Sequence, residues 1–227
     1  MSRRQYDASR RKESAARTRA AIIDAGRQLF VERGYAATTV ADIATAARVA
    51  PATVSAAFGG KSGLLKTMLD VGIAGDDEPV PIAERQIAAD VAAEPDPGKQ
   101  VALLADFVTD VHMRLADLND VMVQASGVDE QVRSDLAWRQ GKRREGMAEF
   151  VQLIDKGAFA PGLDRERAAD IVWALCESRI FIGLVREQGW TPDEYRRWLA
   201  NQLAGALLAD SPVLSRGPVV TSPWPTQ

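Results

Sequence analysis

Residues 39–61 read TVADIATAARVAPATVSAAFGGK, and this stretch predicts two short helices joined by a tight turn. Thr39 is a candidate amino-terminal cap, because an aspartate stands three residues later in the position of a capping box. Pro51 suits the first position of the second helix, since its fixed φ is helical and its missing N–H needs no partner there. Gly59 and Gly60 then end that helix, because glycine accepts a left-handed backbone. The pattern predicts a helix-turn-helix motif.

The segments on either side of this motif also read as helices. Residues 17–33 place apolar side chains on one face at spacings of three and four, and Gly34 follows as a cap. Residues 61–74 carry a second apolar stripe from Leu64 to Leu69. Both stripes are interpreted as core that supports the motif.

These residues resemble the amino-terminal domain of the tetracycline-repressor (TetR) family of transcriptional regulators. The resemblance runs from Ala20 to about Leu69 and includes AIIDAGRQLFVERGY, TTVADIA, TVSAAF and the sequence KSGLL. It implies that residues 50–58 form a recognition helix in the major groove, that two copies read two half-sites, and that the remaining chain dimerises and binds a small effector. The sequence from Gly189 to Leu199 resembles, more loosely, the carboxyl-terminal helices of such regulators.

The charge of the chain is divided unevenly along its 227 residues. Residues 1–66 contain twelve Lys and Arg against five Asp and Glu, a net of about +7, whereas residues 67–227 contain sixteen against twenty-six, a net of about −10. This division favours contact of the amino-terminal part alone with a polyanion. The alternative interpretation of the charge alone is that both parts of the chain are simply charged, solvated surfaces.

The chain as a whole is predicted to be all-α, with a helix-turn-helix head and a helical-bundle body. Helices are expected over residues 82–94, 99–125, 129–157, 164–187 and 192–209, with a kink or break near Asp117–Asp120, and no segment reads as a strand. The expected organisation is a disordered basic arm over 1–16, a DNA-binding domain over 17–75, an effector-binding and dimerisation domain over 76–210, and a disordered proline-rich tail over 211–227. The arm could contact DNA or act only as a solubilising tail.

Candidate DNA contacts come from the motif and the resemblance together. Hydroxyl groups suit phosphates or base edges, methyl groups suit thymine methyls, and cations suit phosphates. The predicted contacts are Thr38, Thr39, Arg48, Pro51, Ala52, Thr53, Ser55, Ala56 and Lys61.

Three features differ from the family pattern. Arg48 stands where the turn glycine is usual, Ala50 replaces the usual serine cap, and residues 55–57 lack the common aromatic and histidine side chains. The predicted recognition helix therefore offers few side chains for direct base readout. Either Arg48 and the arm supply more of the affinity, or specificity depends on DNA shape; a head that no longer binds DNA is the remaining alternative.

The body is expected to hold the effector and the dimer interface. Phe107, His112, Trp138, Trp173 and Cys176 are candidates for an apolar pocket with a few polar groups, although each such residue is more often plain core than a ligand contact. The apolar helices 164–187 and 192–209 are the candidate dimer interface, through Ile180, Leu184, Trp198, Leu203 and Leu207. With one histidine, a His-rich metal site is excluded, and no metal or cofactor is expected.

The sequence therefore predicts a ligand-responsive, sequence-specific DNA-binding regulator, most often a repressor in this family, that binds a palindromic operator as a homodimer. One cysteine, no apolar run of roughly 18 to 20 residues and no signal-peptide pattern predict a cytoplasmic protein. A nonspecific DNA-binding protein is the alternative. An all-helical enzyme is less favoured, because no catalytic constellation or nucleotide-binding glycine loop is found. The effector, the operator, the regulated genes and the sign of regulation are not encoded in these patterns.

Overall fold

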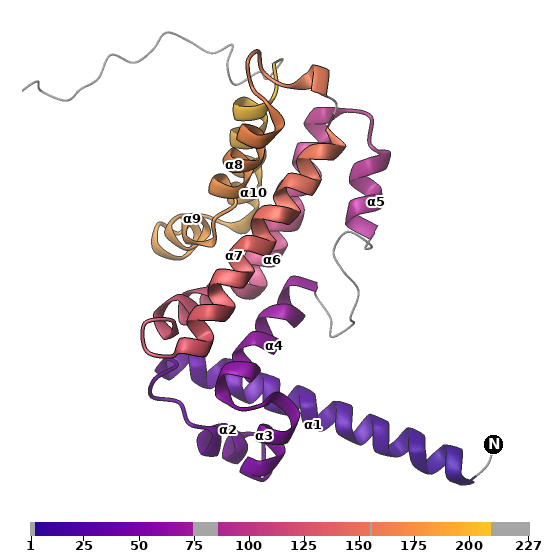
Figure 1. Ribbon diagram of the computed structural model, residues 1–227, viewed down its shortest axis with the longest axis vertical. Coiled ribbons are helices and arrows are strands. Elements are labelled where there is room, and N and C mark those ends of the chain that lie inside the picture. Colours follow the sequence, from indigo (N-terminus) through magenta and orange to yellow (C-terminus); the bar gives the residue numbers. More distant parts are fainter. Residues whose placement is uncertain (1–2, 75–85, 155, 210–227) are drawn as a thin grey trace, which may run out of the picture.

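The computed structural model describes residues 3–74, 86–154 and 156–209, and within these ranges the chain is helical (Figure 1). The expected all-α fold is confirmed. One isolated antiparallel bridge joins Phe159 to Leu208. The elements are α1 (Arg3–Arg33), α2 (Val40–Ala46), α3 (Pro51–Phe58), α4 (Lys61–Ala74), α5 (Gln86–Ala93), α6 (Pro97–Ala125), α7 (Glu130–Leu153), η2 (Lys156–Ala158), α8 (Arg165–Leu175), α9 (Ser178–Phe181), η3 (Ile182–Glu187) and α10 (Pro192–Leu207).

The first four helices form the head that the sequence predicts. α2 and α3 lie at one end of the molecule against α1, and α4 leads from them toward the long helices α6 and α7 (Figure 1). Their packed side chains include Ile22, Phe30, Ile43, Val54 and Leu64, which are completely buried. The apolar stripes inferred from the sequence are therefore the head's core.

The first helix is longer than expected. Disorder was expected for residues 1–16, but α1 begins at Arg3 and continues without interruption to Arg33. Residues 10–20 (RRKESAARTRA) are rich in alanine, arginine and lysine, which have high helix propensity. Adding such residues to an existing helix avoids the unfavourable nucleation step, so the helix extends.

The body consists of the two long helices α6 and α7, with α8 and α10 on one side and α5 on the other (Figure 1). α6 runs unbroken through Asp117–Asp120, where a kink was considered. α7 ends at Leu153, before the expected end at 157, and Gly157 lies in the short η2 helix. The expected domain boundary near 75–81 and the tail 211–227 lie outside the described residues.

The helix expected over 164–187 is divided. α8 begins after Asp164, whose side chain caps it, but ends at Leu175, and Glu177 adopts an extended backbone with ψ of 130° before α9 starts. The chain then widens into the π-helical segment η3. The prediction of one continuous helix is wrong here, and the reason is a contact from α7 that is described below.

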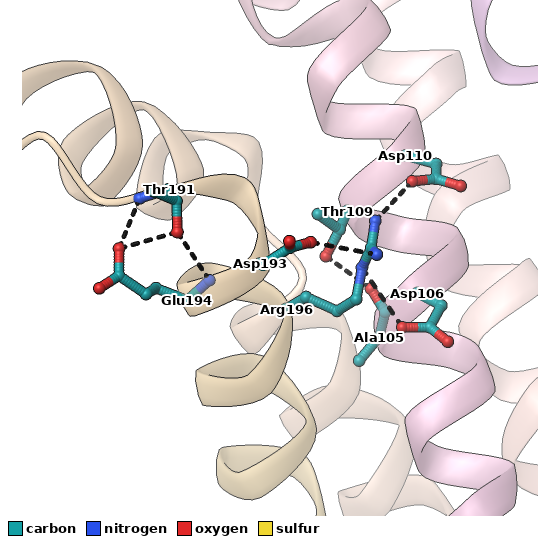
Figure 2. A network of polar contacts seen from close by, with 8 residues as sticks. All are labelled: Ala105, Asp106, Thr109, Asp110, Thr191, Asp193, Glu194 and Arg196. Carbon is teal, nitrogen blue, oxygen red and sulfur yellow. Dashed lines mark hydrogen bonds and ion pairs between the residues drawn. The ribbon is translucent and has the colours of Figure 1, made fainter.

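Helix α10 is fixed at its start and against α6 by polar groups (Figure 2). Thr191 and Glu194 form a complete capping box, as the Thr191-Pro192 sequence predicts for this start. Arg196 lies among three carboxylates, with Nη2 at 2.9 Å from Asp110 and Nε at 3.3 Å from Asp106, both on α6. These pairs are partly exposed, so they orient α10 more than they stabilise it.

Two apolar clusters make up the core, and α6 belongs to both. Its first half, including Val101, Leu104 and Val108, packs in the body cluster with α8 and α10. Its second half packs in the head cluster with α1 to α4, through Leu115, Leu118, Val121, Met122 and Ala125. None of the helices in the described part of the chain is long and apolar enough to cross a membrane.

Candidate DNA-binding and effector-binding sites

The helix-turn-helix has the geometry that its sequence predicts. Thr39 and Asp42 form a capping box at the start of α2, with the threonine N–H donating to the aspartate at 2.9 Å and its hydroxyl accepting from the Asp42 N–H at 3.1 Å. Asp42 consequently has a pKa below its usual value, because Thr39 hydrogen-bonds the charged carboxylate. Gly59 closes α3 with φ of 73°.

Arg48 occupies the turn with a left-handed backbone, at φ of 57°. Among the described residues it is the one non-glycine with a positive φ, and this conformation costs roughly 1 kcal/mol or more relative to glycine. This is the position where the family pattern has the turn glycine. Ala50 leaves α3 without a side-chain cap, as anticipated.

The recognition helix α3 presents small side chains to solvent. Val54 and Phe58 are buried against the head, and Ala52 and Ala56 lie on the opposite side of the helix by its 3.6-residue period. Both alanines and Ser55 are exposed. The outer face of α3 therefore offers methyl groups and one hydroxyl, and its backbone can approach another surface closely.

Most of the predicted DNA contacts are at least partly exposed on the head. Thr39, Arg48 and Pro51 are exposed, while Thr53 and Lys61 are half-buried. Thr38 is different, because its side chain is 1% exposed and its hydroxyl donates to the carbonyl oxygens of Gly34 and Leu29. The prediction of Thr38 as a DNA contact is wrong: it joins the end of α1 to the start of α2.

Lys61 takes part in a link between head and body that the sequence analysis missed. Its Nζ lies 4.0 Å from the centre of the Tyr35 ring and donates to the Tyr35 carbonyl oxygen at 2.9 Å. The Tyr35 hydroxyl donates to Asp129 at 2.6 Å, and Asp129 caps the start of α7. Burial, followed by the hydrogen bond to Asp129, raises the pKa of Tyr35, so this hydroxyl remains a donor at neutral pH.

A second link runs through α4. Arg139 of α7 donates to Asp70 at 2.7 Å, and Arg114 of α6 donates to the Gly72 carbonyl oxygen at 2.9 Å. A Cβ at Gly72 would lie 2.1 Å from Leu115 Cδ2, so this glycine permits the close approach of α4 to α6. α4 is therefore joined by direct contacts to both α6 and α7.

The body contains one polar centre within its apolar core. His112 of α6 is 5% exposed, and its Nδ1 lies 3.3 Å from the Tyr195 hydroxyl of α10. The His112 and Phe181 rings are 5.6 Å apart. Burial, together with the nearby Arg143 charge, lowers the pKa of His112 to about 4, so the imidazole is neutral near pH 7.

Arg143 of α7 explains why α8 ends early. Its Nη1 donates to the carbonyl oxygens of Trp173 at 2.9 Å and Cys176 at 3.1 Å, and its Nη2 donates to Glu177 at 2.5 Å. These are carbonyls that a continuous helix would bond internally. The guanidinium also lies 4.6 Å from the Trp173 ring centre. The basic stretch RQGKRRE over 139–145 was the available signal, but its partners are about 30 residues away in sequence.

The predicted pocket residues do not all come together. His112, Trp173 and Cys176 surround the polar centre and the helix break, and Phe107 packs against the body core. Trp138 lies apart from them: it is 54% exposed on α7, with Lys66 Nζ 5.4 Å from its ring centre. Burial raises the pKa of Cys176 to about 12, so its thiol stays protonated and unreactive. Among the described residues, no three potential metal ligands gather in one place.

The predicted dimer residues also divide. Ile180, Leu184 and Trp198 are half-buried and remain partly available to a partner. Leu203 and Leu207 are completely buried within the monomer, where α10 packs on α6 and α8, so their prediction as interface residues is wrong. Their apolar stripe closes the body core.

The depressed pKa of His112 predicts a loss of stability in mild acid. The unfolded chain, with a histidine pKa near 6.5, binds a proton before the folded chain does, so stability falls as pH falls from about 6.5 to about 4. Between pH 7.5 and 5 we expect this group to remove about 2 kcal/mol from the free energy of unfolding. Urea denaturation at several pH values would measure the loss.

His112→Gln is the matched variant for this prediction, because it keeps a polar side chain without the titration. Its stability should depend less steeply on pH in this range. Since His112 is the one histidine in the chain, its ring proton signals in untagged protein report the pKa directly by nuclear magnetic resonance. A midpoint near 6.5 would contradict the buried, neutral imidazole.

Comparison with known proteins agrees with the geometry of the head and with the whole fold. Residues 22–68 match the family model described as bacterial regulatory proteins, tetR family. No curated protein matches the chain. Among solved structures, NalD from Pseudomonas aeruginosa, the secondary repressor of the MexAB-OprM multidrug efflux pump, is 21% identical with a TM-score of 0.65, and the match covers 87% of this chain and 99% of that chain.

Two further structures are similar at lower identity. The fatty acid degradation regulator FadR from Bacillus halodurans is 17% identical with a TM-score of 0.64, over 83% of this chain and 95% of that chain. A protein from Saccharomonospora viridis, solved in complex with choline, is 16% identical with a TM-score of 0.62, over 84% and 97%.

Residues 22–68, which include α2, α3 and parts of α1 and α4, thus match the tetR-family model, and the chain as a whole has the fold of these solved structures. The resemblance read from the sequence between Ala20 and Leu69 is confirmed.

Proposed function

We propose that this protein is a ligand-responsive, sequence-specific DNA-binding transcriptional regulator that acts as a repressor. The observation that supports this function most directly is the tetR-family match over the helix-turn-helix, together with a recognition helix whose outer face is exposed. The charge division, about +7 over residues 1–66 and about −10 over the rest, supports DNA contact through the head alone.

The body is proposed to bind the effector near the polar centre. His112 and Tyr195 supply neutral hydrogen-bonding groups inside an apolar core, and the break after α8 supplies a segment that can shift. One protein with a similar fold is solved in complex with choline, so a small effector is compatible with this architecture.

Ligand binding is proposed to act through the two head–body links. A ligand that separates α6 from α7 would move α4 through Arg139–Asp70 and Arg114–Gly72, and would move the motif through Tyr35–Asp129. The ligand needs only a differential affinity of a few kcal/mol for the geometry that does not bind DNA.

The proposed assembly is a cytoplasmic homodimer on a palindromic operator. The surfaces of α9, η3 and α10 around Ile180, Leu184 and Trp198 are the candidate interface. Two recognition helices held about 34 to 36 Å apart would enter successive major grooves.

Footprinting of the DNA that flanks the protein's own gene tests the proposal. We expect two protected half-sites about one helical turn apart, with binding that resists competition by random duplex. Equal competition by random duplex would instead support a nonspecific DNA-binding protein. Sedimentation of the same sample would show whether the bound species contains two copies.

A further inference from the structure

A hollow between α1 and the recognition helix is not used by the contacts described above. Its volume is about 370 Å³. The lining residues are Ser14, Ala15, Thr18, Arg19 and Ile22 from α1, and Thr53 and Ala57 from α3. Two hydroxyls and a guanidinium from α1 thus face a third hydroxyl from α3 across an open depression.

The guanidinium of Arg19 is held in place. Its central carbon lies 4.7 Å from the centre of the Phe58 ring, and Phe58 is itself buried in the head. Stacking on an aromatic ring fixes the plane of a guanidinium. Arg19 therefore brings an oriented positive charge to the hollow.

The position of the hollow relative to the outer face of α3 indicates which part of a bound DNA duplex would lie against the hollow. Ala52 and Ala56 form that outer face, and Thr53 and Ala57 lie on its flank toward α1. A major groove is about 12 Å wide, so a helix that enters it has the phosphate rows on its two flanks. Arg19 of α1 contacts Phe58 of α3, and the hollow lies on the flank of α3 toward α1, so it would face one of these rows when α3 lies in the groove.

We propose that this hollow receives a backbone phosphate of the DNA at the rim of each half-site. Ser14 and Thr18 would donate through their hydroxyls, and Arg19 would supply the charge-assisted hydrogen bond. This inference rests on the proposed DNA binding and adds to it a contact outside the helix-turn-helix. The contact positions the head on the duplex and reads no base.

The test compares two arginines on the same helix. Arg19→Gln removes the charge at the hollow, and Arg17→Gln removes an equal charge from an exposed position that does not line it. On the footprinted operator at about 0.15 M salt, we expect Arg19→Gln to weaken binding about tenfold and to lower the slope of log K against log salt by about 1. Arg17→Gln should change affinity less than about threefold.

Thr18→Val provides an independent variant that keeps Arg19 stacked on Phe58 and removes only a hydroxyl. We expect it to weaken binding about threefold. Replacing the rim phosphates one at a time with neutral methylphosphonate should reveal one position that weakens wild-type binding but does not further weaken Arg19→Gln. Circular dichroism would verify that both variants fold.

The outcomes separate this inference from the function on which it rests. Wild-type protein that binds no duplex would overturn both. Wild-type protein that binds its operator, with equal losses for the Arg17 and Arg19 variants and no coupled phosphate, would overturn the phosphate site and leave the DNA-binding function standing.

Discussion

Ser55→Glu is expected to reduce operator affinity by at least about 100-fold. Ser55 is exposed on the recognition helix beside Ala52 and Ala56, so the new carboxylate would enter the major groove between two rows of phosphates. It would also be larger than any side chain on the outer face of α3. Fluorescence anisotropy with a labelled operator measures the loss directly.

The fold should tolerate this change, because surface substitutions away from special contacts usually alter stability by less than about 0.5 kcal/mol. Ala137→Glu on the exposed side of α7 introduces the same charge away from α3 and serves as the control. We expect it to retain nearly normal affinity. Undiminished binding by Ser55→Glu would place DNA recognition on another surface of the protein.

Arg143→Met is expected to lower the free energy of unfolding by about 3 kcal/mol. The substitution leaves the carbonyl oxygens of Trp173 and Cys176 without their donor, and each unsatisfied group costs about 1 to 3 kcal/mol. It also leaves Glu177 without its cation. The partial exposure of this pair allows water to recover some of the loss, which keeps the expected value below the full sum.

Arg144→Met is the matched control, because Arg144 is the next residue and pairs with Asp170 on the surface. Its removal should cost less than about 1 kcal/mol. Urea denaturation of both variants measures the difference. If both variants lost the same small amount, the Arg143 contacts would not be what holds the break between α8 and α9.

The head could be predicted from the sequence because its signals are local. The capping residues Thr39 and Asp42, the proline that starts α3 and the glycines that end it act within a few residues of their own positions. Even the strained turn at Arg48 followed from the absence of glycine there. Such features depend on backbone conformation more than on tertiary packing.

The body and the candidate effector site were harder to predict because their determinants are distant in sequence. Arg143 ends α8 from a position 30 residues earlier, and Tyr35 meets Asp129 across 94 residues. Helical periodicity placed Leu203 and Leu207 on an apolar face of their helix. It did not show whether a second copy or the same chain covers that face. The same limit applies to Trp138, because the sequence alone does not show which side of its helix packs against the core.

Because α6 belongs to both apolar clusters, the head and the body of this protein cannot simply be separated or exchanged with those of another regulator. A fragment ending near residue 75 would lose the five α6 side chains, Leu115 to Ala125, that complete the head's interior, and it would expose the surface they cover. A chimera that fuses this head to the body of another regulator would therefore need the matching half of α6, or compensating substitutions on α1 and α4, to remain folded. Exchange of specificity between regulators is simpler by replacing the outer residues of α3 than by exchanging whole halves.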